Sequence, residues 1–334
     1  MKHTALVVSF LALSACGDSA SSTDTADTAS SPDTVDTVDT VDAADTSGPD
    51  APDPDTQLGP DVDPDTADAS PDTTPDLWDA PPSTLSVSVQ TWAGGTPRTS
   101  IGGALRADAM PNTYVVADAT DDCRLLLGEN PFCDPFCDGT LCTAPNVCTP
   151  YPALLSAGTL TVSGGGGRPV VLEPDVTGYG TSFEAQTFAD GTAITFAAAG
   201  GEVPAFAETL TAPPTIVVAD LDRVSLKSPL VFDWDAPTTS NDTRVLIRLQ
   251  ADRGQHGRAL SAILECDVPD TGHFEIPSTL QSQYVADDLW GCGKCPASSI
   301  TRYAAKRIQV GSHEVALRVE SSAVFLLTTW TNAQ

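Results

Sequence analysis

The spacing of the cysteines is the feature of this 334-residue chain that most limits how it can fold. Cys16 stands alone near the amino terminus, and the other eight cysteines fall into two clusters. The first cluster holds five and the second three, namely Cys123, Cys133, Cys137, Cys142 and Cys148, then Cys266, Cys292 and Cys295. Because both counts are odd, at least one disulfide must join the clusters if all eight thiols are paired. We expect such a bond to tie the two halves of the folded region together.

Disulfides form in exported proteins, and the pattern at the amino terminus predicts an export signal. A basic start at Lys2 precedes an apolar run from Ala5 to Leu13, which is too short for a membrane span of about 20 residues. An ordinary secretory signal peptide is a better alternative than a membrane span. However, Leu13-Ser14-Ala15-Cys16 resembles the end of a bacterial lipoprotein signal peptide, which would occupy residues 1–15.

This resemblance implies where in the cell the protein is located. In lipoproteins the cysteine of the motif carries the lipid, so Cys16 would anchor the mature chain in a membrane of the cell envelope. An Asp directly after the lipidated cysteine would favour the inner membrane. Position 17 is Gly instead, and the absence of Asp there favours the outer membrane. The membrane, contacted through the lipid on Cys16, is thus one expected partner.

An acidic segment follows the anchor. Its 66 residues, from 17 to 82, include 18 Asp and no Glu, Lys or Arg. Such a composition buries too little apolar surface to offset the entropy of the chain, so we expect residues 16–82 to be a lipidated cysteine followed by a disordered linker.

The remainder of the chain is also acidic. Subtracting the linker's 18 Asp and Lys2 from the totals of 45 acidic and 16 basic residues leaves 27 acidic and 15 basic residues in the segment 83–334. Binding to phosphate depends on clustered Lys and Arg, so this charge disfavours a nucleic-acid partner.

Hydrophobic patterning predicts an all-β fold after the linker. Short runs rich in Val, Ile, Leu and Thr recur between turn-forming residues, which favours an antiparallel β-sandwich region of one or two sandwiches. Residues 278–286 and 298–305 are candidate short helices. Ser321-Ser322 is expected to be the turn of a terminal hairpin.

Two further resemblances bear on the domains. The segment 229–249, with Trp234 before a Pro-containing loop and an alternating strand, resembles fibronectin type III and immunoglobulin-like sandwiches. It implies a β-sandwich domain over 213–334, after a β-rich region 83–212 with a Cys-rich insert at 123–150. The cysteine spacing of that insert resembles uncharacterised Cys-rich surface lipoproteins of myxobacteria and their relatives, which implies an address but no activity.

Several short motifs resemble catalytic or metal-binding sites, but the residues around them do not match such sites. Zinc competes with disulfides for the first cluster, but an oxidising compartment removes thiolate ligands. Cys292-Gly293-Lys294-Cys295 has redox-motif spacing without a βαβ context, and Asp270-Thr271-Gly272 is interpreted as a turn. We therefore expect no catalytic residues, metal or cofactor.

The sequence thus predicts a lipid-anchored envelope protein that displays a non-enzymatic binding or structural module on an acidic stalk. A polysaccharide or a protein at the cell surface is the expected ligand. The alternatives are an envelope hydrolase without a linear motif and a redox-active lipoprotein that uses Cys292 and Cys295.

Overall fold

The computed structural model describes residues 82–92, 95–129, 131–221, 224–226, 228–238, 243–253, 260–286, 289–290 and 297–327. The chain divides into two units, Met1–Asp68 and Ala69–Gln334, and every described residue belongs to the second. The expected signal peptide 1–15, Cys16, the linker as far as residue 81, Cys292 and Cys295 lie outside the described residues.

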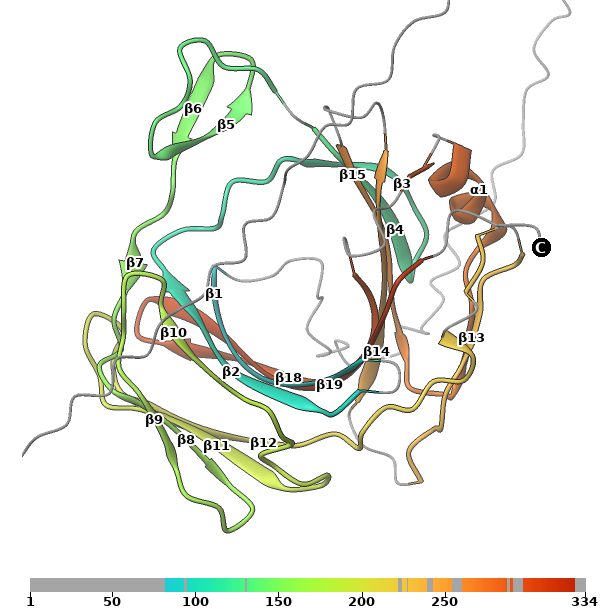
Figure 1. Cartoon of the computed structure of the whole chain (residues 1–334). Coiled ribbons are helices and arrows are strands. Elements are labelled where there is room, and N and C mark those ends of the chain that lie inside the picture. Colours follow the sequence, from blue (N-terminus) through green and yellow to red (C-terminus); the bar gives the residue numbers. More distant parts are fainter. Residues whose placement is uncertain are drawn as a thin grey trace, which may run out of the picture. The chain divides into compact units, whose positions relative to one another are not determined.

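One large, strongly curved sheet organises the described part (Figure 1). Its main path has the order β10-β2-β1-β19-β18-β14-β15-β4-β3, with β7 paired to β2 and β17 to β14. The strands are β1 (Ser83–Trp92), β2 (Arg98–Arg106), β3 (Tyr114–Ala119), β4 (Cys123–Gly128), β7 (Leu154–Leu155), β10 (Tyr179–Phe183), β14 (Arg244–Arg253), β15 (Leu260–Pro269), β17 (Leu289–Trp290), β18 (Ser298–Val310) and β19 (His313–Phe325). All these pairings are antiparallel except β1 with β19, which is parallel.

This strand order corrects the expected domain division. Strands of segment 83–212 occupy both ends of the sheet, and strands of segment 213–334 fill its middle. The expected boundary at residue 212 therefore does not separate two domains. β1 and β19 lie near the two ends of the folded region, and their hydrogen bonds join the strands of the two segments into one sheet.

A second sheet covers one part of the convex face of the large sheet (Figure 1). It has four strands in the order β12-β11-β8-β9, which are β8 (Leu160–Gly164), β9 (Val170–Leu172), β11 (Ala193–Ala198) and β12 (Phe206–Thr211). Alternating residues of both sheets, such as Val87, Leu317 and Phe196, are fully buried in the first hydrophobic core between them.

A mixed layer covers the convex side of β14 and β15. It includes the pair β13 (Val231–Asp233) and β16 (His273–Glu275) and the helix α1 (Ser278–Ala286). Val245, Ile247 and Leu249 of β14 point into this second core, where they meet Phe232 and Leu280. The all-β expectation is confirmed, with two layers packed against one shared sheet.

Local predictions had mixed outcomes. The helix over 278–286 is confirmed as α1, but the candidate helix at 298–305 is wrong, because these residues belong to β18 between two partner strands. The expected turn at Ser321-Ser322 is also wrong. Both serines lie within β19, where Ser321 Oγ accepts a hydrogen bond from Ile216 N (3.1 Å) and Ser322 Oγ lies 2.9 Å from the hydroxyl of Thr301.

Three disulfides join cysteines of the described residues. Cys123–Cys266 joins β4 to β15 and links the two cysteine clusters, which is the kind of bond expected if all eight thiols are paired. Cys133–Cys142 and Cys137–Cys148 both lie in the Cys-rich insert, which contains the hairpin of β5 (Thr140–Ala144) and β6 (Val147–Pro150). Within the described residues, no helix is long and apolar enough to span a membrane.

Candidate functional site

The Cys-rich hairpin, residues 131–151, stands out from the sheets on the connection between β4 and β7 (Figure 1). Neither hydrophobic core includes any of its residues, so its shape depends on local bonds. The two disulfides fasten the loop 132–139 to the β5–β6 pair. Asn146 adds two hydrogen bonds to that loop, one from its backbone N–H to Phe132 O (3.1 Å) and one from Asp134 N to its side-chain oxygen (2.9 Å).

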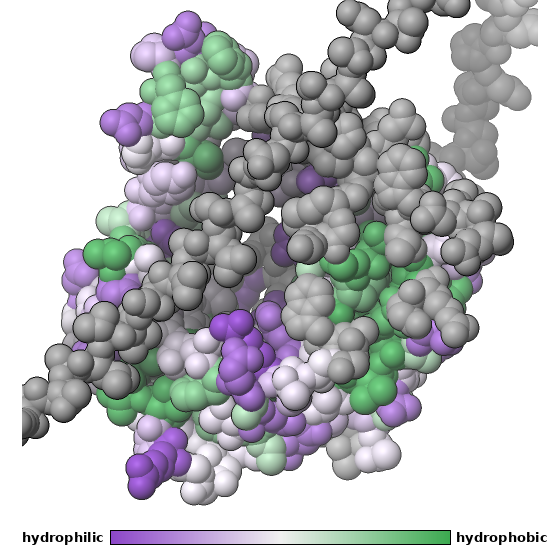
Figure 2. Space-filling view, in the orientation of Figure 1, coloured by the Kyte–Doolittle hydropathy of each residue, from purple (hydrophilic) through white to green (hydrophobic). Residues whose placement is uncertain are grey.

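This rigid hairpin exposes aromatic side chains. Phe132 and Phe136 directly precede the bridged Cys133 and Cys137, and their exposures are 72% and 88%. Figure 2 shows hydrophobic residues gathered on the hairpin, at the top left of the view. Seven of the thirteen large hydrophobic residues that are exposed in the described part lie between 110 and 151. A concentration of this kind indicates an interaction surface, because single exposed apolar residues are normally scattered.

A cleft of about 440 Å³ separates the hairpin from the edge of the large sheet. Tyr114 of β3, Phe136 of the hairpin and Tyr151 after β6 contribute its aromatic lining. The described residues that line it are Thr113, Tyr114, Gly128, Glu129, Pro131, Phe136, Cys137, Thr140, Leu141, Cys142, Tyr151 and Ser261. Its volume is within the range of ligand sites, and its lining combines aromatic and apolar residues with several polar ones.

The polar groups of the cleft come from both of its walls. Thr113, Glu129 and Ser261 lie together at one end of the strands β3, β4 and β15, and Thr140 belongs to β5. Glu129 N donates a hydrogen bond to Thr113 O (2.7 Å), which fixes the backbone that carries the Glu129 carboxylate. Glu129 is exposed and is the one charged residue among the described lining residues. The cleft can therefore offer aromatic faces, hydroxyl groups and one carboxylate to a ligand.

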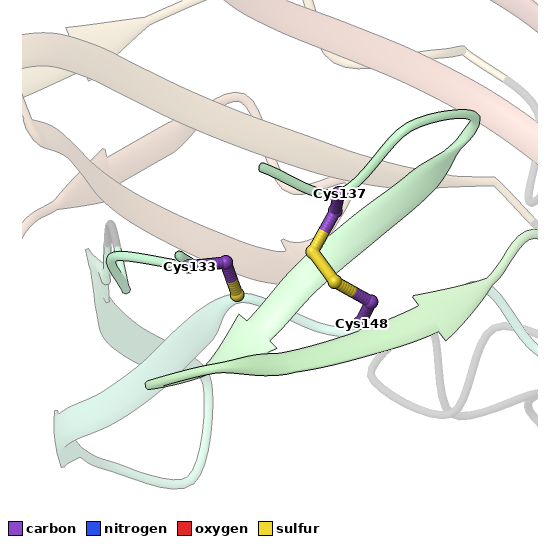
Figure 3. A group of neighbouring side chains, drawn as sticks. All are labelled: Cys133, Cys137 and Cys148. Carbon is purple, nitrogen blue, oxygen red and sulfur yellow. A yellow bond between two sulfur atoms is a disulfide. The ribbon is translucent and has the colours of Figure 1, made fainter. Parts of the chain in front are cut away.

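The hairpin sulfurs are also close enough to suggest a metal site. The Sγ atoms of Cys133, Cys137 and Cys148 all lie within 4.8 Å of one another, and Figure 3 shows the bond between the last two. Cys133 is bonded to Cys142 in turn. Because a metal binds thiolates, the sulfurs of these bridges are committed to holding the hairpin.

The concave face of the large sheet carries a network of ion pairs. Arg124 of β4 bonds Glu265 of β15 (Nε–Oε1 2.7 Å), and Arg244 of β14 bonds Asp267 (Nε–Oδ1 3.0 Å). The Tyr303 hydroxyl also donates to Asp267 Oδ1 (2.8 Å). Burial raises the pKa of Asp267, although the bonds from Tyr303 and Arg244 oppose this effect. These charges compensate one another across neighbouring strands.

A buried ion pair joins β18 of the large sheet to the segment that follows β15. Asp270 accepts hydrogen bonds from Arg302 (Nε–Oδ2 2.6 Å) and from the Trp234 indole (2.8 Å), and both members of the ion pair are almost fully buried. The segment Asp270-Thr271-Gly272 is a bend, as expected, and Trp234 is buried in the second core. Asp270 is therefore a structural counter-ion for Arg302.

The expected Cys-rich insert at 123–150 is too long at its start, because Cys123–Gly128 is β4 of the large sheet, and only the part from residue 131 on leaves the sheet. The sequence did not identify the cleft. Its lining is drawn from residues 113 to 261, so no local pattern contains it. One usable signal was the repeated Phe-Cys pair at 132–133 and 136–137, which places large apolar side chains beside fixed cysteines. In comparisons with known proteins, no family model and no curated sequence matches this chain.

Proposed function

We propose that this chain is a lipid-anchored envelope protein whose folded part is a non-enzymatic binding module, and that it holds its ligand at the cleft beside the Cys-rich hairpin. The observation that carries the proposal is the disulfide-fixed cleft of about 440 Å³ with three aromatic side chains in its lining. Its mode of display is the lipid on Cys16 and the acidic linker that follows it.

Rigidity supports a binding role for the exposed aromatic residues. A flexible loop loses side-chain and backbone freedom when it binds, which costs about 0.5–1.5 kcal/mol for each immobilised side chain. Two disulfides already restrict the hairpin that carries Phe132 and Phe136. Aromatic residues on a preorganised surface are the groups that most often dominate the energy of an interface.

The binding proposal is tested with the purified full-length protein in detergent. Surface-polysaccharide fractions and a panel of synthetic peptides are immobilised and probed with the wild type and with Phe136→Ser/Tyr151→Ser. The matched control is Phe183→Ser, which removes another exposed aromatic residue, in β10 at the opposite end of the large sheet. We expect the cleft variant to lose retention on at least one ligand and the control to keep it. Equal retention by all three proteins on every ligand would refute the proposal.

The anchoring proposal has a separate test. Cells that express the wild type or Cys16→Ser are labelled with a palmitate analogue and fractionated. We expect the label and the membrane association to depend on Cys16. An unlabelled wild-type protein, or unchanged membrane association of the variant, would contradict lipid anchoring and leave the binding test unaffected.

A further inference from the structure

We infer that the ligand of the hairpin cleft is a basic polypeptide segment, which places a Lys or Arg side chain between the aromatic residues and Glu129. This inference rests on the proposed function, because it names the class of ligand for the same cleft. It is carried by the charge around the cleft, by the chemistry of the lining and by the apolar surface that continues onto the hairpin.

Charge around the cleft favours a cation. The hairpin, residues 131–151, has two acidic residues and no basic residue, Glu129 lies two positions before it, and Arg124 is the nearest basic residue in the sequence. Arg124 is already paired with Glu265 of β15. Among the acidic residues, Glu129 lines the cleft, and Asp134 and Asp138 are exposed on the hairpin. The local potential therefore attracts positively charged groups and repels anionic ones such as phosphate or uronic acids.

The lining has the groups that hold an ammonium or guanidinium ion. The faces of aromatic rings attract cations, and Tyr114, Phe136 and Tyr151 provide three such rings. Glu129 supplies a full negative charge in the same cleft, and no described residue forms an ion pair with it. A neutral sugar would use the rings and hydroxyl groups but would leave this carboxylate without a counter-charge.

The apolar surface beside the cleft favours a polypeptide over a free amine. Phe132 and Val147 are exposed on the same hairpin, at 72% and 50%, outside the cleft lining. A small amine would fill the cleft and leave them in water. A peptide with apolar residues on either side of its basic residue would cover them at the same time.

The test uses the full-length protein in detergent and a fluorescent nonapeptide in which a central Lys is flanked by apolar residues. A second peptide carries acetyl-lysine at that position, which keeps the length and removes the charge. Binding is followed by fluorescence anisotropy at physiological salt. We expect the acetylated peptide to bind about ten-fold more weakly, because it loses both the ion pair and the cation–π contact.

Two pairs of variants localise the effect. Glu129→Gln removes the carboxylate and Phe136→Leu removes the ring but keeps an apolar side chain, and we expect each to weaken binding of the Lys peptide about three- to five-fold. The matched controls are Glu275→Gln, an exposed residue of β16, and Phe183→Leu, and both should bind as the wild type does. All four proteins keep the acidic linker, so attraction to its Asp residues is the same in each.

Three outcomes separate this inference from the function on which it rests. Equal binding of the Lys and acetyl-lysine peptides would overturn the basic-ligand inference. Equal weakening by Glu275→Gln and Glu129→Gln would also overturn it, because the charge of the whole chain would then explain the binding. If the Lys peptide fails but a neutral oligosaccharide binds and depends on Phe136, the cleft remains a binding site and only the class of ligand is wrong.

Discussion

Among the three disulfides of the described residues, Cys123–Cys266 should contribute most to the stability of the fold. It joins residues 143 positions apart, so in the chain-entropy treatment its loss costs about 5 kcal/mol. The hairpin bridges close loops of only 9 and 11 positions, which corresponds to about 2.7 kcal/mol each. The two hairpin bridges lie inside the loop that Cys123–Cys266 closes, and they shorten its effective length by ~15 residues. This shortening lowers the expected contribution of Cys123–Cys266 by only about 0.1 kcal/mol.

The perturbation is the double variant Cys123→Ala/Cys266→Ala, assayed by urea unfolding with tryptophan fluorescence and far-UV circular dichroism. With a urea slope of about 3 kcal/mol/M, a loss of about 5 kcal/mol lowers the midpoint by roughly 1.7 M, or leaves the variant unfolded without urea. Both sulfurs are buried in the second core, so lost packing acts in the same direction.

The control is Cys133→Ala/Cys142→Ala, which removes a bridge that contributes to neither core. We expect it to unfold the hairpin locally and to shift the global midpoint much less. If both double variants shift the midpoint equally, the long-range role of Cys123–Cys266 is refuted.

Three further predictions concern the interior, and each is checked by the same urea titration. Asp270→Asn should cost about 3–5 kcal/mol, because Arg302 is then buried without a counter-charge; a cost below about 1 kcal/mol would contradict this. Tyr284→Phe should change stability by less than about 1 kcal/mol at pH 7, since the Tyr284 hydroxyl is buried with no hydrogen-bond partner among the described residues. Burial also raises the pKa of Tyr284 above its value of about 10 in the unfolded chain. The stability that the neutral hydroxyl contributes is therefore complete below pH ~10 and is lost as the pH rises further. Above that pH, Tyr284→Phe should lose less stability than the wild type. Gly103→Ala should cost about 2–4 kcal/mol, because its new Cβ would lie 1.9 Å from Thr84 O at a φ of +147°; wild-type stability would show that β1 and β2 are not paired in this register.

Local sequence patterns predicted local structure well where one physical cause dominated. Alternation along 244–249 places Val245 and Ile247 in the core and Arg248 on the concave face, which the period of two in a strand requires. The odd cysteine counts predicted a bond between the clusters if all eight thiols are paired, and Cys123–Cys266 joins them. The first inference uses the geometry of a strand and the second uses the number of cysteines, so neither needs knowledge of the tertiary contacts.

The failures have the opposite cause, since each depends on partners distant in sequence. Ser321-Ser322 has turn-forming composition, yet β18 and β1 pair along both sides of β19 and keep it extended. The parallel register that places Leu85 beside Leu317 joins strands more than 200 positions apart, so no local signal could reveal it. The expected domain boundary at residue 212 was wrong for the same reason, because strands from both sides of it belong to one sheet.

The two sets of disulfides act on different parts of the free energy, and this difference bears on the binding proposal. Cys123–Cys266 lies in a core that already has buried hydrophobic contacts, whereas the hairpin bridges hold a segment that belongs to neither core. Leaving Phe132 and Phe136 in water forgoes about 1.5–3 kcal/mol of burial for each ring. That free energy becomes available when a partner covers the rings, and the bridges reduce the entropy lost at that moment. A hairpin fixed by two bridges is therefore expected where exposed aromatic residues must be ready to bind.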